Sequence, residues 1–176
     1  NFASLSGKKV KDKEVLVYLF CTDHLAGDDW KRLWKKKFDF PYKGITKLDK
    51  RVNANLDLIK KFADLGVQKN QIFLAGQSCG GWAIMMLISK YPEKVAGGIS
   101  THHACYGELS KKYKVKKVGI EKALEIFKKK NPGPAVLREN QIKDISKAKN
   151  LPVLVFTHPK DPYDGLLSDW VEEIPG

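Results

Sequence analysis

The sequence predicts an α/β fold in which a mostly parallel sheet is flanked by helices. Three observations carry this prediction. Short apolar runs recur along the chain, amphipathic segments lie between them, and glycine or proline marks many of the boundaries. Strands that alternate with helices are typical of a parallel sheet. The 176 residues, 43% of them hydrophobic, suffice for a single domain over 1–176 with a core of its own.

The N-terminal half begins with a buried strand and ends with an amphipathic helix. The continuous apolar run 15–20, rich in β-branched residues, predicts a strand covered on both faces. Tryptophan and leucine at helical spacing predict a helix over 27–37, followed by a loop over 38–44. Apolar residues at three- and four-residue steps predict a helix over 52–65, which Gly66 ends as a C-cap.

The middle of the chain repeats the pattern of strand, helix and strand. Residues 71–75 form a short apolar run and are expected to be a buried strand. A pair of glycines then leads into the apolar helix expected over 82–91, which Pro92 stops. Residues 95–100 are expected to form the next strand of the same sheet.

The C-terminal part separates two strands by a long charged segment, 107–149. Within it, a helix is expected near 119–130, and Asn131–Pro134 is expected to break it. The apolar run 152–156 predicts a fourth buried strand. Residues 168–173 are expected to begin a last helix.

The net charge of +12 invites a nucleic-acid partner, but the kind of basic residue argues against one. Only Arg32, Arg51 and Arg138 are arginines, and the lysines are spread along the chain. Readout of base edges depends on the forked guanidinium group. We therefore expect no nucleic acid as partner. The longest apolar runs, such as 83–88, fall far short of the roughly 18 residues that a membrane span needs, so no span is expected.

The three cysteines each follow a predicted strand. Cys21, Cys79 and Cys105 cannot form a complete disulfide framework, and no CxxC pair is present. Their spacing fits no standard zinc pattern, so no metal site is expected. We interpret them as small residues beside a site. Free thiols favour a reducing compartment, while the start at Asn1 instead of Met leaves export after processing open.

The sharpest motif is Gly76–Gly81, which matches G-x-S-x-G. In this motif the serine lies on a tight turn between a strand and a helix, where flanking side chains clash and glycine is favoured. The turn presents the hydroxyl of Ser78 above the sheet. It also places the backbone N–H of Cys79 at a helix N-terminus, where an oxyanion can be stabilised. A glycine-rich turn without chemistry and a phosphate-binding loop are the alternatives, although no lysine follows as in a Walker loop.

Three segments together resemble the α/β-hydrolase superfamily. They are the turn with its strand (72–81), the strand 96–100, and the strand with its following loop (152–163). The dienelactone hydrolase and carboxylesterase branch is the most similar. Dienelactone hydrolases have a cysteine nucleophile where this chain has Ser78, which favours an esterase.

The resemblance implies roles for individual residues. Ser78 is the expected nucleophile, and Asp161 is the expected acid that orients the base, with Asp164 a poorer candidate. The backbone N–H of Cys79 is one expected oxyanion donor. The superfamily also often inserts a lid before the acid strand, which here corresponds to 107–149.

The second oxyanion donor is expected from the loop after the first strand. The superfamily often has a His-Gly pair there, and this chain does not. Cys21 is therefore assigned as donor only by position, and Thr22 is an equal alternative. His24 lies in the same loop and is expected to contact substrate.

The base of the triad is the main departure from the family pattern, because no histidine follows Asp161. We expect the base in a C-terminal piece beyond this sequence. Residues 35–50 also contain no apolar run for the strand that the superfamily has there. Both observations lead us to expect that the domain is incomplete. A histidine from elsewhere, or an inactive relative that keeps the fold, remain as alternatives. His102 and His103 follow a strand and are candidates for a substituting base. His103 is also assigned to the substrate pocket, and His158 is expected to position the acid loop.

The sequence thus predicts a serine hydrolase of ester-type substrates that forms an acyl-enzyme on Ser78. The expected partner is a small-molecule ester, and no metal or organic cofactor is expected. The alternative is a non-catalytic binding protein with the hydrolase fold, motivated by the missing histidine and the missing His-Gly pair.

Overall fold

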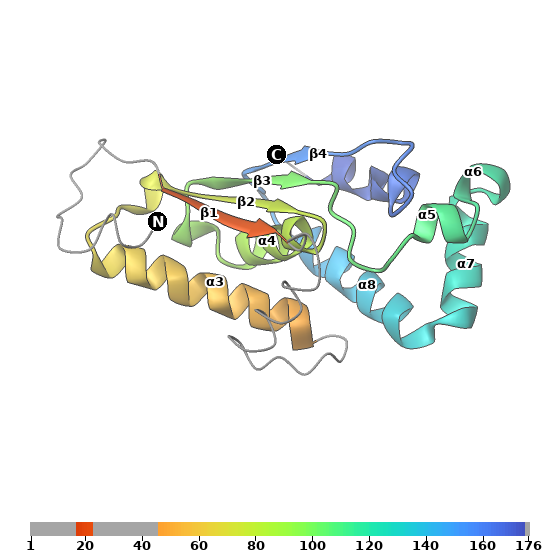
Figure 1. Ribbon diagram of the computed structural model, residues 1–176, viewed down its shortest axis with the longest axis horizontal. Helices are drawn as coiled ribbons and strands as arrows, with labels where there is room; N and C mark the ends of the chain where they lie inside the picture. The colour runs from red at the N-terminus through yellow and green to blue at the C-terminus, as the bar shows by residue number, and fades with distance from the viewer. Residues whose placement is uncertain (1–16, 23–45, 175–176) are drawn as a thin grey trace, which may run out of the picture.

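Four parallel strands form one sheet in which the spatial order, β1-β2-β3-β4, is also the order along the chain. The structure is a computed structural model that describes residues 17–22 and 46–174 (Figure 1). The strands are β1 (Val17–Thr22), β2 (Ile72–Gln77), β3 (Gly97–Thr101) and β4 (Val153–Phe156). The predicted α/β class with its parallel sheet is confirmed. The helix expected over 27–37 and the loop over 38–44 lie outside the described residues.

All four strands end at the same level of the sheet. The register pairs Thr22 with Gln77, Gln77 with Thr101, and Thr101 with Phe156. Each of these is the last residue of its strand. The residues that follow β2, β3 and β4 therefore leave the sheet side by side, at the carboxyl edge where open parallel sheets bind their ligands.

Two helices cover one face of the sheet, α3 (Thr46–Asp64) and α4 (Cys79–Lys90), and both lie on the same side of it (Figure 1). Helix α4 is apolar nearly all round and packs between the sheet and α3, as a buried helix must. The largest fully buried apolar side chains of this core are Trp82, Ile72, Leu74, Ile84, Met85, Leu87, Ile88 and Ile145. On the opposite face Leu154 and Phe156 stay about half exposed, at 58% and 49%.

The predicted C-cap of α3 is confirmed. Gly66 has a φ of +86°, in the left-handed region that favours glycine. The N–H of Gly66 donates to the carbonyl of Ala63 at 2.9 Å, and the N–H of Val67 donates to the carbonyl of Phe62 at 3.0 Å. This pair of bonds is a Schellman motif, so the helix ends where the glycine predicts.

The segment between β3 and β4 forms four helices with a small core of its own. They are α5 (Leu109–Lys112), α6 (Val115–Val118), α7 (Ile120–Lys130) and α8 (Pro132–Ile145). Their buried apolar side chains are Leu109, Tyr113, Val115, Ala123, Phe127 and Ala135, joined by Leu167. Figure 1 shows α5, α6 and α7 beyond the ends of the strand arrows, at the carboxyl side of the sheet. The segment predicted as a lid therefore lies beyond the carboxyl ends of the strands.

Two local expectations in this region were correct only in part. Asn131–Pro134 does break α7, but it also begins α8, with Asn131 as the N-cap. Proline is tolerated in the first helical turn because its missing N–H has no intrahelical partner there. The last helix expected from 168 is instead the 3-10 helix η3 (Gly165–Glu173). Among the described residues, no helix has the length and apolar character required to span a membrane.

Candidate active site

Ser78 lies on the turn between β2 and α4 with φ +56° and ψ −130°. This positive φ is uncommon for a residue other than glycine and costs on the order of 1–3 kcal/mol. The turn is held on both sides. The N–H of Ser78 donates to the carbonyl of Thr101 at 3.1 Å, and its own carbonyl accepts the N–H of Trp82 at 3.1 Å. The strained serine is thus fixed by β3 on one side and by the first turn of α4 on the other.

The two glycines of the motif pack backbone against backbone. A Cβ on Gly76 would lie 2.6 Å from the carbonyl carbon of Gly80 and 2.5 Å from Cδ1 of Ile84. Real Cβ atoms do not approach other atoms so closely. Gly76 is therefore required for the turn, as the spacing of the motif predicts.

A Gly76→Ala variant is expected to lose about 3 kcal/mol of unfolding free energy, because the new methyl group meets backbone atoms of Gly80 that cannot move independently. The matched control is Gly133→Ala, at a glycine with no atom within 4 Å of the added Cβ. This control is expected to stay within about 0.5 kcal/mol of the parent protein. Urea unfolding followed by circular dichroism measures both. Equal stability of the two variants would contradict the close packing of the turn.

A cleft of about 390 Å³ opens beside the serine. It is formed by the ends of β2 and β3 and by the loop after β4. The lining residues are Gln77, Ser78, His102, Ala104, His158, Lys160, Asp161, Pro162 and Tyr163. The structure thus brings together the predicted nucleophile and the predicted acid, which are 83 positions apart in the sequence.

The hydroxyl of Ser78 donates a hydrogen bond of 3.0 Å to the backbone carbonyl of Ala104. The carboxylate of Asp161 is half-buried, and its Oδ1 accepts the N–H of Tyr163 at 2.8 Å. This bond across two residues forms a tight turn that holds the carboxylate in place. Among the residues that the structure describes, no donor is bonded to the second carboxylate oxygen.

Two histidines line the cleft, and they differ in what their rings can do. His158 accepts the N–H of Lys160 on Nδ1 at 3.0 Å, so its neutral ring carries the proton on Nε2 and acts as a donor. Its backbone carbonyl also accepts the N–H of Asp161 at 2.9 Å, which suits the predicted role of holding the acid loop. His102 is exposed and directly follows β3, which pairs with the strand that leads to Ser78.

The prediction that His103 lines the pocket was wrong. His102 has a φ of +46°, and this left-handed residue turns the chain so that His103 faces inward. The ring of His103 is 0% exposed and lies edge-on against Trp170, with centroids 5.7 Å apart. Burial, together with the charges of Arg138 and His102, lowers the pKa of His103 to about 4. It is a neutral core residue, and His102 takes the place in the cleft.

Asp164 is also buried and does not line the cleft, which supports its lower ranking as the acid. Its Oδ2 lies 3.8 Å from Nη2 of Arg138, with only 2% and 4% of the two side chains exposed. Arg138 also donates to the carbonyl of Leu167 at 2.9 Å and lies over the ring of Trp82. Burial raises the pKa of Asp164 to about 6, against the opposing effect of Arg138. The pair anchors η3 to α8 behind the turn.

The shifted pKa values of His103 and Asp164 predict opposite effects of pH on stability. The pKa of His103 is lower in the folded state, so this residue makes the protein more stable as pH rises from about 4 to about 6.5. The pKa of Asp164 is higher in the folded state, so it makes the protein less stable as pH rises from about 4 to about 6. Each effect is about 3 kcal/mol, and the two nearly cancel.

A His103→Gln variant is therefore expected to expose the effect of Asp164. Its free energy of unfolding should fall with rising pH between about 4 and 6, relative to the parent protein. Chemical unfolding at a series of pH values measures the difference in slope. The companion Asp164→Asn should change the slope in the opposite direction. Parallel pH profiles for the parent protein and both variants would contradict the two shifts.

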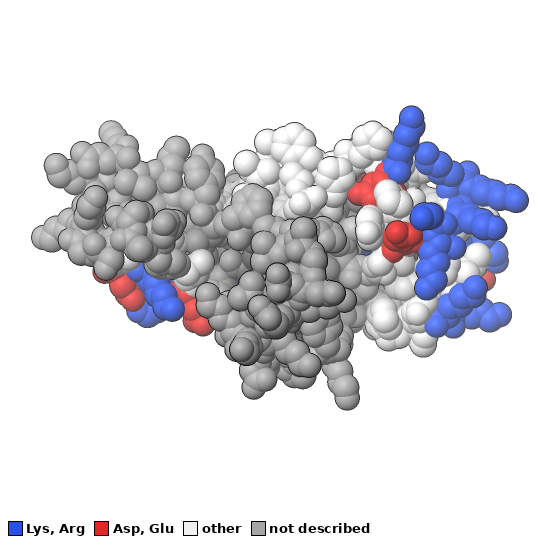
Figure 2. Space-filling view, viewed as in Figure 1, with Lys and Arg blue, Asp and Glu red and all other residues white. Residues whose placement is uncertain are grey.

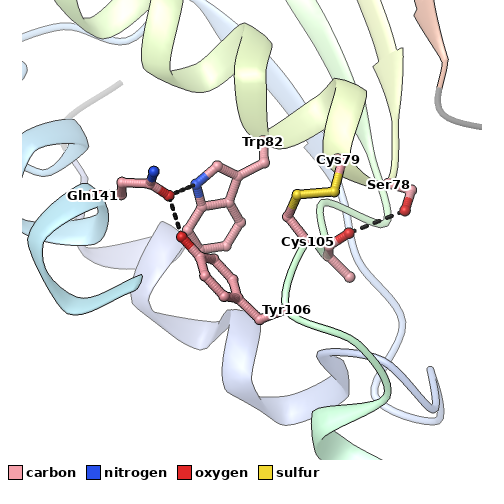
Figure 3. Close-up of a disulfide and its surroundings, with 7 residues drawn as sticks. Ser78, Cys79, Trp82, Cys105, Tyr106 and Gln141 are labelled. Carbon is pink, nitrogen blue, oxygen red and sulfur yellow. Dashed lines mark hydrogen bonds between the residues drawn. A yellow bond between two sulfur atoms is a disulfide. The ribbon is translucent and has the colours of Figure 1, made fainter. Parts of the chain in front are cut away.

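Cys79 and Cys105 form a disulfide between the first residue of α4 and the loop after β3 (Figure 3). This corrects the expectation of free thiols. The Cα atoms are 4.4 Å apart, and the two cysteines are separated by 26 positions. A signal for this pairing was present, since both cysteines closely follow strands that are neighbours in the sheet. The strand order that makes them neighbours comes only from the structure.

The disulfide lies between the serine and a buried polar network. Ala104, which accepts the Ser78 hydroxyl, directly precedes Cys105. On the other side, Oε1 of Gln141 accepts Nε1–H of Trp82 at 2.7 Å and the hydroxyl of Tyr106 at 2.5 Å (Figure 3). Burial raises the pKa of Tyr106, so its hydroxyl stays protonated and remains a donor. The turn, the β3–α5 loop and α8 are thereby joined into one support.

Of the two expected oxyanion donors, the structure locates the backbone N–H of Cys79 beside Ser78. Cys79 begins α4, where the first N–H groups have no intrahelical partner, so its backbone N–H is available as the structure stands. Cys21 and Thr22 were expected in a loop, but both belong to β1, with Cys21 in register with Gly76. His24 lies outside the described residues. Within the described ranges, no cluster of three or more histidines, cysteines or carboxylates is suited to hold a metal ion.

The fold and the turn define an α/β protein with a conformationally strained serine at the carboxyl edge of a parallel sheet. Comparisons with protein-family models, with curated proteins and with solved structures found no match. The geometry of the site is therefore the basis for assigning a function.

Proposed function

We propose that this chain is a serine hydrolase that cleaves ester-type acyl bonds. We also propose that its domain is of the α/β-hydrolase type, which the sequence resembles. The observation that carries the proposal is the positive φ of Ser78 on a strand-to-helix turn that opens onto a cleft shared with Asp161. Strained non-glycine residues cluster at active sites, where the surrounding structure holds them in place. The turn aims a hydroxyl at the place where an acyl carbonyl can bind.

In the proposed reaction, Oγ of Ser78 attacks the acyl carbon while its proton passes to a histidine base. The N–H of Cys79 stabilises the oxyanion at the N-terminus of α4, and the helix dipole adds to this effect. Collapse of the tetrahedral intermediate expels the alcohol, which takes the proton from the base and leaves an acyl group on Ser78. Water, activated by the same base, then releases the acid and restores the serine.

His102 is the base that the described residues support best. It lines the cleft, it directly follows the strand beside Ser78, and its ring is exposed. His158 is less suitable because its Nδ1 already accepts a backbone N–H, which leaves Nε2 protonated. For catalysis, the hydroxyl of Ser78 exchanges its bond to the Ala104 carbonyl for a bond to the base, and Asp161 orients the ring.

The experiment that tests the proposal is covalent labelling by a fluorophosphonate, which reacts only with an activated serine. We expect one adduct per chain, located on Ser78 by peptide mass spectrometry. Ser89→Ala is the matched control, because Ser89 also donates its hydroxyl to a backbone carbonyl, at 3.1 Å, but does not line this cleft. The control should label normally, and His102→Gln should label much more slowly. An absence of adduct on Ser78 in the native protein would contradict the proposal.

The second candidate is a binding protein with the same cleft and no catalysis. The observation in its favour is the hydrogen bond from Ser78 to Ala104, because a serine bound to a carbonyl is not activated. This candidate predicts that small esters or acids bind in the cleft without turnover. Binding measured by calorimetry, together with absent labelling, would select it.

A further inference from the structure

A highly basic surface covers one end of the molecule, over the helices α5, α6 and α7 (Figure 2). We call residues 108–130 the lysine-rich end. This segment contains nine lysines and three glutamates, a net charge of +6, which is half of the +12 of the whole chain. The lysines are Lys111, Lys112, Lys114, Lys116, Lys117, Lys122, Lys128, Lys129 and Lys130. Their side chains are exposed, so the charge faces solvent.

Most of this charge is not neutralised within the protein. Lys111, Lys122 and Lys128 each lie within 4.0 Å of a glutamate carboxylate. The other six have no carboxylate at that distance among the residues that the structure describes. Like charges held together on one surface repel one another, and an anionic partner relieves that repulsion. The lysine-rich end therefore favours an anionic surface.

The tip of this end also exposes apolar side chains. Val118 and Ile120 flank Gly119, at the junction of α6 and α7, and are 37% and 36% exposed. Val115, at 1% exposure, anchors the same turn to the small core beneath it. The tip thus presents two branched apolar side chains between lysines, while the buried Val115 holds the turn against the small core.

We propose that the lysine-rich end docks on a membrane surface that contains anionic phospholipids. Each lysine near such a surface raises the affinity about fivefold. The aliphatic stems of the lysines lie along the boundary while their charged ends reach the headgroups. Val118 and Ile120 insert between the headgroups, as the apolar residues of peripheral membrane proteins do. An anionic bilayer satisfies both the charge and the exposed apolar pair.

Nucleic acid is a poorer match for the same surface. Residues 108–130 contain no arginine for base readout. Their two aromatic residues, Tyr113 and Phe127, are buried at 6% and 4% exposure and cannot stack on bases. The exposed valine and isoleucine would also have no partner on a phosphate backbone. The observations therefore favour lipid over polynucleotide.

Docking places the candidate active site close to the membrane. The N–H of Ser110 donates to the carbonyl of Tyr163 at 2.6 Å, and the N–H of Lys111 donates to the carbonyl of Pro162 at 2.9 Å. Pro162 and Tyr163 line the cleft, so α5 links the lysine-rich end directly to the wall of the site. Docking itself requires no chemistry at Ser78, and the inference does not depend on the proposed function.

The test measures co-sedimentation of the full chain with vesicles of phosphatidylcholine mixed with phosphatidylserine, and with phosphatidylcholine alone. We expect binding to the mixed vesicles only, weakened by salt.

Lys116→Glu with Lys117→Glu should lower the partition coefficient at least about tenfold. The charge-matched control, Lys61→Glu with Lys143→Glu, changes exposed lysines on α3 and α8 and should stay within about twofold. Val118→Ser with Ile120→Ser should lower binding about threefold or more.

Three results would overturn the inference. The first is equal binding to neutral and mixed vesicles, or to neither. The second is an equal loss in the control and in the Lys116 and Lys117 variant, which would show that net charge alone acts. The third is undiminished binding after Val118→Ser with Ile120→Ser, combined with tighter binding to single-stranded RNA than to vesicles. A Ser78→Ala variant should bind vesicles normally, which separates this test from the test of hydrolysis.

Discussion

Replacement of Ser78 by alanine is expected to lower kcat/KM for a p-nitrophenyl ester by at least about 10³-fold. The substitution removes the hydroxyl that attacks the acyl carbon, and residues 76–81 contain no second hydroxyl that could replace it. The backbone N–H of Cys79 stays in place, so a small residual rate is expected from oxyanion stabilisation alone. Initial rates at several ester concentrations give the value.

Two companion variants separate chemistry from structure. Ser89→Ala removes a hydroxyl with a similar backbone hydrogen bond and should retain full activity. Ser78→Gly should be as inactive as Ser78→Ala, yet more stable by about 1 kcal/mol, because glycine adopts a φ of +56° without strain. Hydrolysis that persists in both Ser78 variants would exclude this serine as nucleophile. Equal stability of the two variants would exclude strain at the turn.

Removal of the disulfide is expected to have the largest effect on stability. Cys79 and Cys105 close a loop of 26 positions, and the chain-entropy model assigns about 3.5 kcal/mol to such a cross-link. The double variant Cys79→Ala with Cys105→Ala should lose about this much unfolding free energy. Its ester hydrolysis should also fall about tenfold or more, because Cys79 and Ala104 hold the serine in place.

Reduction provides the control for this experiment. A dithiol reductant should lower the melting temperature of the parent protein to that of the double variant and leave the double variant unchanged. Thiol titration of the unfolded, unreduced chain should find at most one free thiol, against three after reduction. Three thiols before reduction, or a melting temperature insensitive to reductant in the parent protein, would contradict the cross-link.

Local sequence was sufficient wherever a feature depends on neighbouring residues. Gly66 ends α3 because only a residue that readily adopts positive φ closes a Schellman motif. Ser78 lies on a strained turn because the glycines around it allow two backbone segments to meet. The strand runs predicted the four strands to within about two residues, because continuous apolar runs fit a parallel sheet.

Features that depend on distant residues were not predicted. The pairing of Cys79 with Cys105 requires β2 and β3 to be neighbours, and strand order is a property of the folded sheet. Which of the two histidines lines the cleft depends on the left-handed backbone of His102, directly after β3. None of these is encoded in a short window of sequence.

The sequence by itself determined the α/β class, the position of the serine turn and the ends of several elements, since these follow from apolar periodicity and from the conformational freedom of glycine and proline. Only the tertiary structure decided which groups share the cleft, which cysteines are bonded and where the lysines gather. The physical reason is that the carboxyl ends of parallel strands meet at one edge, so residues far apart in the chain become neighbours there. The lysines of 108–130 likewise become one surface only because α5, α6 and α7 fold around a shared core.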